Sequence, residues 1–486
     1  MDYIDGEFRK VKTRSVGKAW EPKDTTIQTA PKERRGSKPS PDSVVELQQR
    51  LEEPPSEIIS DRWDLITAIE SATTVQPKLK RVSPNTISKL LEVTMDSFFD
   101  DEDQYRYLAQ ITGSPLMFLK SAINETKDWV RDLDNFSRRT FSNKTSSYFS
   151  SESPTLAVLP NNSEQEALFV IAQAIMARSA LVIRPSRMKA SSYISIKFAE
   201  AWSNIIDRLP EKYNFLRKAL NVVNFYDLDE LWRTASIDSW NYVCFGSGDT
   251  IKEITETING YARPRKIIGY GLGFSTTIID KSTCESGKNI EDIAEEVLAS
   301  STVNSGNECT ATDIAYIHEE IYDTLYEKLR EKSQQFRSLD PLEPNSIGIV
   351  SSENTEFIVN TLTQMDKLKY LNTETLNNGQ PAVHCSVVPL LRYESAMEFP
   401  GPILCVKAYS NKEDLVEQMN RELEINKTPK FLVASVYGSQ LFLKNIIPRI
   451  KVCKIRHNKP SHIVDLYQPH QGINLLYELS DFTEIE

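Results

Sequence analysis

The chain has 486 residues, 40% of them hydrophobic, and a formal net charge of −11 at pH 7. This length allows a large buried core and two or three domains, while the acidic balance argues against a general nucleic-acid binder. The six cysteines show no paired spacing and the five histidines no ligand spacing, so we expect neither a disulfide framework nor a metal site. No apolar run approaches the roughly 18 residues of a membrane span and no signal peptide is recognised, so the expected compartment is the cytoplasm.

The first part of the chain divides by composition. Residues 7–42 are rich in Lys, Arg, Ser, Thr and Pro and poor in large apolar side chains, so residues 1–60 are predicted to form an extended or disordered arm. Residues 61–150 are predicted to form a helical N-terminal region. In residues 87–93, for example, apolar side chains recur at the i, i+3 and i+4 spacing of a helix.

Strands and helices alternate over residues 151–275, and this pattern predicts a dinucleotide-binding domain. Single helices between strands imply parallel crossovers, with ligands bound at the carboxyl ends of the strands. The expected strands are residues 155–159, 180–183, 222–225, 242–245 and 266–269, and the expected helices are 164–178, 190–206 and 250–260.

A second α/β block, the catalytic domain, is predicted at residues 276–458, followed by a C-terminal segment at 459–486. Its expected elements are helices at 290–301 and 318–335 and strands at 313–317 and 430–437. Cys309 follows the first of these helices in a polar turn that contains Gly306. The backbone N–H groups of such a turn can point at a thiolate or at an oxyanion beside it. The alternative for any single cysteine is an inert buried side chain.

The segment around this cysteine, residues 304–309, reads Asn-Ser-Gly-Asn-Glu-Cys. It resembles the Asn-x-Gly-Gln-x-Cys nucleophile segment of the aldehyde dehydrogenase superfamily, with Asn307 in place of Gln. Further segments resemble other motifs of that superfamily in the same order, namely residues 160–163, 181–186, 245–247 and 398–402. The resemblance implies an aldehyde-dehydrogenase-like α/β fold, with a parallel-sheet nucleotide-binding domain and an α/β catalytic domain.

The resemblance also assigns roles to residues. It implies Cys309 as the nucleophile and Asn162 as a donor to the oxyanion. The implied cofactor-binding residues are Arg184, Ser186, Arg187, Gly246, Ser247 and Glu398. NAD-preferring members commonly hold a carboxylate where this chain has Arg187, and an arginine pairs instead with a 2′-phosphate. The implied cofactor is therefore NADPH.

One departure from the superfamily bears on the reaction. Hydrolytic members carry the general base Glu where this chain has Tyr270, and a tyrosine, with an ordinary pKa of about 10, is a poor base at neutral pH. Residues 242–251, 263–271 and 470–479 resemble LuxC-type fatty-acyl-CoA reductases, although Gln471 stands where Asp is usual. This narrower resemblance implies NADPH-dependent reduction of an acyl thioester, carried by coenzyme A or a carrier protein, to an aldehyde.

Two other hypotheses remain open. The first is NAD(P)-dependent aldehyde oxidation with a base that the sequence does not identify; Glu308, beside the nucleophile, is one candidate. The second is a catalytically degenerate scaffold in a biosynthetic complex. The expected partners are an acyl-transferring protein and further copies of this chain, with residues 459–486 as the expected oligomer contact.

Overall fold

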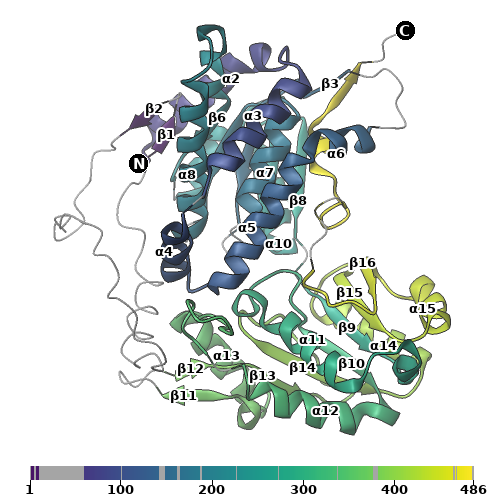
Figure 1. Ribbon diagram of the computed structural model, residues 1–486. Helices are drawn as coiled ribbons and strands as arrows, with labels where there is room; N and C mark the ends of the chain where they lie inside the picture. The colour runs from purple at the N-terminus through teal and green to yellow at the C-terminus, as the bar shows by residue number, and fades with distance from the viewer. Residues whose placement is uncertain are drawn as a thin grey trace.

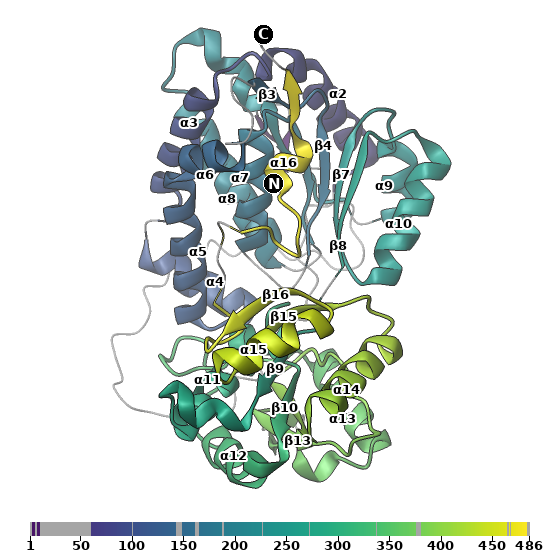
Figure 2. The same cartoon turned by 90° about the vertical axis from the view of Figure 1, so that its right-hand side faces the viewer.

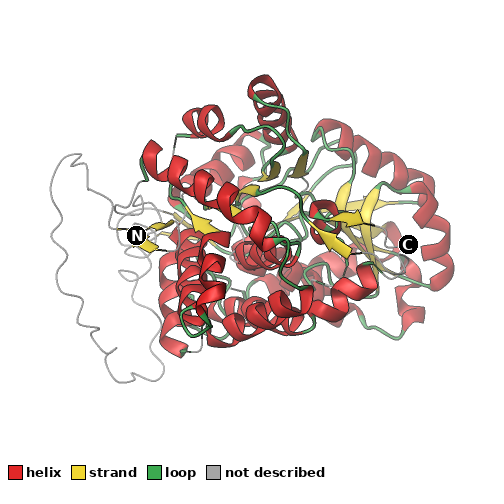
Figure 3. Ribbon diagram, turned by 90° about the horizontal axis from the view of Figure 1, so that it is seen from above, coloured by secondary structure: helices red, strands yellow, loops and turns green. Residues whose placement is uncertain are grey.

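A computed structural model arranges the chain in two lobes, one above the other in Figure 1. The upper lobe holds the described elements that precede residue 275 together with those that follow residue 474, and the lower lobe holds the elements between these positions. Seen from above, helices flank the strands (Figure 3). The structure describes residues 2–4, 7–9, 60–99, 101–141, 148–160, 165–186, 189–225, 227–271, 273–336, 338–375, 381–463, 466 and 468–483.

The helices that precede residue 141 belong to the core of the upper lobe. The first of them begins after Asp61, whose carboxylate accepts hydrogen bonds from two backbone N–H groups of the first turn. Leu91 and Trp129, on the second and fourth helices, belong to the same buried cluster as Val182 in the sheet. The helical region therefore shares one hydrophobic core with the first sheet. Its helices are α2 (Arg62–Leu79), α3 (Pro84–Ser97), α4 (Glu102–Thr112), α5 (Leu116–Arg131) and α6 (Leu133–Thr140).

The first sheet has the strand order β2-β1-β6-β5-β4-β7-β8. The neighbouring strands in the part β6-β5-β4-β7-β8 pair in parallel. When these five strands are numbered by their order in the chain, their order in the sheet is 3-2-1-4-5, which is the doubly wound arrangement of dinucleotide-binding sheets. Its ligand crevice lies where the order reverses, between β4 and β7. The strands are β1 (Asp2–Ile4), β2 (Glu7–Arg9), β4 (Thr155–Val158), β5 (Leu181–Arg184), β6 (Leu220–Val222), β7 (Asn241–Phe245) and β8 (Lys266–Tyr270), and the helices are α7 (Gln165–Met176), α8 (Lys189–Ile206), α9 (Leu228–Ala235) and α10 (Gly248–Tyr261).

The second sheet is parallel throughout, in the order β13-β14-β10-β9-β15-β16. Strand β10, which follows the Cys309 turn, is fully buried between β14 and β9. A short hairpin, β11–β12, lies beside this sheet. The strands are β9 (Thr276–Ile279), β10 (Ile314–His318), β11 (Thr373–Thr375), β12 (Pro381–Val383), β13 (Ser386–Pro389), β14 (Ile403–Tyr409), β15 (Phe431–Tyr437) and β16 (Val452–His457), and the helices are α11 (Ile290–Thr302), α12 (Glu319–Ser333), α13 (Ser352–Gln364), α14 (Lys412–Ile425) and α15 (Gln440–Ile446).

After the second sheet the chain returns to the upper lobe (Figure 2). There α16 (Leu475–Leu479) packs on α7, and the Leu476 N–H donates to Gln173 Oε1 at 3.0 Å. Strand β17 (Asp481–Thr483) pairs with β3 (Tyr148–Ser150). The described part of the C-terminal segment thus contacts the first lobe of its own chain, and its role in an oligomer stays a prediction.

Most of the expected elements of both sheets are confirmed within one or two residues. The strand expected at 222–225 is wrong, because β6 ends at Val222. Beyond that residue, the Asn224 carbonyl accepts a hydrogen bond from the Ser60 N–H and the Phe225 carbonyl accepts one from Arg184, so these carbonyl groups do not pair with a neighbouring strand. Helix α9 was not expected from the sequence, and neither were β1 and β2, which add two strands to the edge of the first sheet at β6.

Candidate active site

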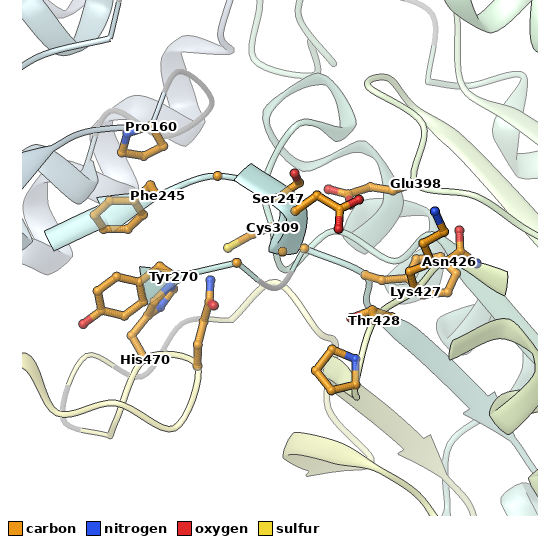
Figure 4. A pocket seen from close by; sticks show the side chains of 18 of the residues that line it. Pro160, Phe245, Ser247, Tyr270, Cys309, Glu398, Asn426, Lys427, Thr428 and His470 are labelled. Atoms are coloured by element: carbon orange, nitrogen blue, oxygen red, sulfur yellow. The ribbon is translucent and has the colours of Figure 1, made fainter. Parts of the chain in front are cut away.

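A pocket with a volume of about 450 Å³ lies between the two lobes. The upper lobe contributes the end of β7, the first turn of α10 and the end of β8, and the lower lobe contributes Cys309, Glu398 and the turn after α14. Figure 4 shows the Cys309 thiol between these two groups of side chains. Four residues predicted from the sequence, Cys309, Gly246, Ser247 and Glu398, therefore line one cavity.

The backbone before the nucleophile is strained. Asn304 (φ 47°), Ser305 (φ 59°) and Gly306 (φ 76°) follow one another in the left-handed region, which disfavours residues that carry a Cβ. A Cβ on Gly306 would lie 2.2 Å from the carbonyl oxygen of Gly401. Only glycine fits at this position, and the nucleophile turn packs directly on the backbone that follows Glu398.

Hydrogen bonds from neighbouring segments hold the residues on either side of the thiol. The Ser275 hydroxyl, at the start of β9, donates to the Cys309 carbonyl at 3.0 Å. The Ser461 hydroxyl, from the C-terminal segment, donates to the Thr310 carbonyl at 2.7 Å. The Asp313 carboxylate accepts from the Ser275 N–H at 2.7 Å. The nucleophile turn is thus tied to β9 and to the segment that leads back to the upper lobe.

The surroundings of the thiol favour its protonated form. Burial raises the pKa of Cys309 well above its ordinary value, and the nearby carboxylates of Glu308, Glu166 and Glu398 raise it further. The Cys309 residue is nevertheless partly exposed to the pocket. Its sulfur is therefore accessible, and full activation requires positive charge or donated hydrogen bonds from bound groups.

The turn between β7 and α10 has the geometry of a phosphate site. Ser247 is the N-cap of α10, and its hydroxyl accepts from the Thr250 N–H at 3.2 Å. A Cβ added to Gly248 would meet nothing within 4 Å, so the first turn of the helix opens into free space. A helix N-terminus at the carboxyl edge of a doubly wound sheet favours an anion such as a pyrophosphate.

Glu398 faces this turn from the lower lobe. A Cβ on Gly273 would come within 2.4 Å of its Oε1 atom, so the carboxylate lies directly against the glycine backbone that links the two lobes. Its side chain is open to the pocket, while partial loss of water in the cleft raises the pKa of its carboxyl group. A carboxylate in this place can accept hydrogen bonds from sugar hydroxyls.

Tyr270 ends β8 with its ring in the pocket. The ring stacks on Phe245 with centroids 4.7 Å apart, and the residue is only 2% exposed. Burial, followed by the charges of Glu166 and Glu478, raises the pKa of its hydroxyl above the ordinary value of about 10. In Figure 4 that hydroxyl points away from the Cys309 sulfur. Tyr270 therefore cannot serve as a base toward a group held on Cys309.

Arg184 and Ser186 do not line the described pocket, and the positions of Asn162 and Arg187 are not described. Arg184 is buried at the end of β5 and donates from Nε to the Phe225 carbonyl at 2.8 Å. Ser186 is also buried, and the part of the pocket that the structure describes includes neither residue. Asn162 and Arg187 lie outside the described residues. Their predicted roles, and those of Arg184 and Ser186, stay predictions.

The sequence did not assign roles to two titratable residues of the pocket, Glu166 and His470. Glu166 lies in the first turn of α7, four residues beyond Asn162. The sequence position of this carboxylate, about one helical turn after Asn162, could have identified Glu166 as a candidate site residue. His470 stood in a segment recognised only as a resemblance, and its place in the pocket depends on the return of the chain to the upper lobe.

A model of the aldehyde dehydrogenase family matches residues 59–475. The chain belongs to the aldehyde dehydrogenase family. This result confirms the expected fold class and places the chain among oxidoreductases that act on aldehydes. Of the helices that the structure describes, none has the length and apolar character needed to cross a membrane.

Solved structures of the family resemble this chain over most of its length. The glyceraldehyde-3-phosphate dehydrogenase GapN of Methanocaldococcus jannaschii, complexed with NADP, has a TM-score of 0.72 and 13% identity, covering 88% of this chain and 94% of that one. Lactaldehyde dehydrogenase of Escherichia coli gives 0.70 and 17%, covering 88% and 91%. An NAD-dependent benzaldehyde dehydrogenase of Corynebacterium glutamicum gives 0.69 and 14%, covering 88% and 90%.

Proposed function

We propose that this member of the aldehyde dehydrogenase family reduces an acyl thioester to an aldehyde with NADPH, through an acyl group held on Cys309. The observation that carries the proposal is Tyr270, buried at the end of β8 where hydrolytic members of the family have a base. Without a base at that place, an acyl-Cys309 thioester resists water and persists until it is reduced. The resemblance of residues 242–251, 263–271 and 470–479 to LuxC-type fatty-acyl-CoA reductases supports the same reaction.

The chain's own groups would act in two half-reactions. In the first, the Cys309 thiolate attacks the acyl carbon, a new C–S bond forms, and the carrier thiol leaves. In the second, reduction of the acyl carbon is followed by cleavage of the C–S bond, which releases the aldehyde and restores the thiolate. Asn162 is proposed to donate to the carbonyl oxygen in both, a contact of a kind worth about 2.7–4 kcal/mol.

The described residues fit a nicotinamide cofactor. The crevice between β4 and β7 opens onto the α10 N-terminus, where Ser247 and Gly248 would hold the pyrophosphate. Glu398 would hold the nicotinamide ribose. Its carboxylate can occupy this position because Gly273 has no side chain there. The cofactor supplies the two electrons of the reduction. Arg187 would select NADPH, with Arg184 and Ser186 nearby; one solved relative is complexed with NADP.

One observation favours aldehyde oxidation as a second candidate function. The Glu166 carboxylate lines the same pocket as Cys309 and lies close enough to raise the pKa of the thiol. It could therefore take over the role of the absent base and activate a water toward the acyl-enzyme. The two functions differ in whether the acyl-enzyme decays without NADPH.

The test is intact-protein mass spectrometry after mixing with a panel of acyl-CoAs, with and without NADPH. Thioester reduction predicts an adduct that is stable alone and lost with NADPH in the wild type, and no adduct in Cys309→Ala. Cys453→Ala, which removes another partly exposed thiol, should behave like the wild type. An adduct that decays equally without NADPH would support oxidation. A chain that neither forms an adduct nor binds NADPH would support a scaffold role.

Partners remain part of the proposal. The acyl donor would be coenzyme A or a carrier protein, delivered in the second case by an acyl-transferring protein. We also expect a homo-oligomer. Size-exclusion chromatography with light scattering tests the oligomer, and acylation from acyl-carrier protein in place of acyl-CoA tests the donor.

A further inference from the structure

Glu166 is a buried carboxylate with incomplete hydrogen bonding. Its side chain is only 9% exposed, and among the described residues its Oε2 has no hydrogen-bond partner. Burying a charged oxygen without a donor is costly. The His470 imidazole lies beside this carboxylate, with its Nε2 atom 3.9 Å from the Glu166 Oε1 atom. This separation is an ion-pair distance and is too long for a hydrogen bond.

The backbone and the surrounding rings fix the position of His470. The two residues that follow it, Gln471 (φ 51°) and Gly472 (φ 81°), are left-handed, and the Ile473 N–H closes the turn on the His470 carbonyl at 2.8 Å. The imidazole lies 5.4 Å from the Tyr270 ring and 6.0 Å from the Phe169 ring. A strained turn that directs one imidazole into a cavity is a feature of functional sites.

Both residues share the cavity of the nucleophile. Glu166, His470 and Cys309 line the same pocket, and Figure 4 shows the His470 ring beside Tyr270 on the side of the pocket that the thiol faces. Among the described lining residues, His470 is the only imidazole. The Tyr270 hydroxyl points away from the thiol, and an imidazole is a common general acid or base in proteins.

The proposed thioester exchange needs an acid here. A departing thiolate would add a negative charge to a cavity that the carboxylates of Glu166 and Glu398 already line. An ordinary alkyl thiol has a pKa of about 8.5 and an ordinary imidazolium about 6.5, so transfer of the proton to the leaving sulfur is downhill. The Glu166 carboxylate, 3.9 Å from the imidazole, is placed to orient the ring.

Resting on the proposed thioester reduction, we infer that His470 is the acid that protonates the leaving thiol during acylation of Cys309, with Glu166 as its positioning carboxylate. The bond from the acyl carbon to the carrier sulfur breaks as the bond to Cys309 sulfur forms. The imidazolium proton moves to the departing sulfur, and the imidazole later recovers a proton from water. No oxidation or reduction occurs in this step. The proton is the one that the overall reduction consumes.

The test follows acylation alone, without NADPH, by quenched mass spectrometry with two donors of the same acyl group. One donor is the acyl-CoA, and the other is a thioester of 2-nitro-5-thiobenzoate, whose acidic thiol leaves without an added proton. His470→Gln should slow acylation by acyl-CoA by about 10²–10⁴-fold but leave the aryl thioester close to the wild-type rate. Glu166→Gln should give the same selectivity with a smaller loss, and added imidazole should restore part of the rate in His470→Ala.

The matched control is His457→Gln. This imidazole lies on β16, contacts the Gly438 carbonyl at 2.9 Å and is outside the described pocket, so acylation by both donors should be unchanged. Equal losses with both donors in His470→Gln and Glu166→Gln would overturn the inference, while an adduct on wild-type Cys309 would keep the proposed function. An adduct that water removes in the wild type but not in Glu166→Gln would also overturn it and assign the pair to hydrolysis. Failure of every donor to acylate the wild type would remove both proposals.

Discussion

The two turns that meet in the pocket are built in opposite ways. The nucleophile turn, residues 304–306, is buried, strained and packed against the backbone at Gly401. The nucleotide turn, residues 246–249, is exposed, is capped by Ser247 and has open space above Gly248. The first fixes one reacting atom, whereas the second leaves room for a large ligand. Close packing fixes the position of the thiol, whereas the lack of packing above the nucleotide turn leaves space for a ligand.

The largest effect is expected from Gly306→Ala. The added methyl group would require both a left-handed alanine and a contact of 2.2 Å with the Gly401 carbonyl, so we expect destabilisation by at least about 2 kcal/mol. Displacement of the turn should also abolish acylation of Cys309. Urea unfolding and mass spectrometry measure the two effects. Wild-type stability and acylation in this variant would show that the turn is not packed as described.

The electrostatics of the nucleophile turn can be tested with Glu308→Gln. Loss of this carboxylate should lower the pKa of Cys309, because a thiolate is less disfavoured with one negative charge fewer nearby. Alkylation by iodoacetamide, followed by mass spectrometry across pH, should become faster at neutral pH. Glu356→Gln, at an exposed site on α13, is the control. An unchanged alkylation profile would exclude Glu308 as a cause of the shift.

The raised pKa of Cys309 also predicts how the stability of the folded protein changes with pH. The folded protein holds the Cys309 proton more tightly than the unfolded chain does. The stabilisation is therefore fully present below the unfolded thiol pKa of about 8.5 and is lost as pH rises through the folded value. Wild-type stability should fall more steeply in alkali than that of Cys309→Ala, as measured by urea unfolding from pH 7 to pH 10. Parallel curves would contradict the expected burial of this thiol.

A smaller effect is expected at the nucleotide turn from Ser247→Ala. Loss of an N-cap costs about 1 kcal/mol, and we also expect weaker NADPH binding because the turn would no longer be held for the pyrophosphate. Ser439→Ala provides a matched control, since Ser439 caps α15 with a bond of the same 3.2 Å length outside the described pocket. Fluorescence titration with NADPH should separate the two variants. Equal affinity in both would argue against a phosphate site at α10.

The smallest effect is expected from Gly248→Ala. No atom lies within 4 Å of the added methyl group, so the change in unfolding free energy should stay within about 0.5 kcal/mol. Because the methyl group would project into the space proposed for the cofactor, NADPH affinity should fall while stability does not. Comparison with Gly306→Ala by urea unfolding tests directly whether one turn is closed and the other open. Similar losses of stability would remove the distinction.

Local patterns in the sequence were sufficient for several strands of the two sheets. Alternating apolar segments located β4, β5, β7 and β8, and the turn chemistry around Cys309 separated α11 from β10. The same patterns could not reveal β1 and β2, because these three-residue strands pair with each other and, through β1, with the distant strand β6. They could not locate the end of β6 either, because the Asn224 and Phe225 carbonyls beyond it pair with Ser60 and Arg184, which lie far away in the sequence.

The candidate site was predicted in part for a related reason. Cys309, Gly246, Ser247 and Glu398 belong to local motifs, and the structure brings all four to one pocket. Glu166 and His470 meet only because residues 459–479 carry the chain back to α7. A contact across about 300 positions of sequence leaves no local signature. For Arg184 the local motif suggested a contact with the cofactor, whereas in the structure its side chain donates to the Phe225 carbonyl.

The return of the chain end to the upper lobe sets an order of events during protein synthesis. Leu475 and Leu476 are fully buried in the core of that lobe, and the Gln173 side chain pairs with the Leu476 N–H. On a ribosome that adds roughly 5–20 residues per second, the first sheet would be made early, but part of α7 would stay uncovered until residues 475–479 emerge. Nascent chains stalled before residue 475 should therefore expose apolar surface to chaperones, even though they already contain every strand of both large sheets.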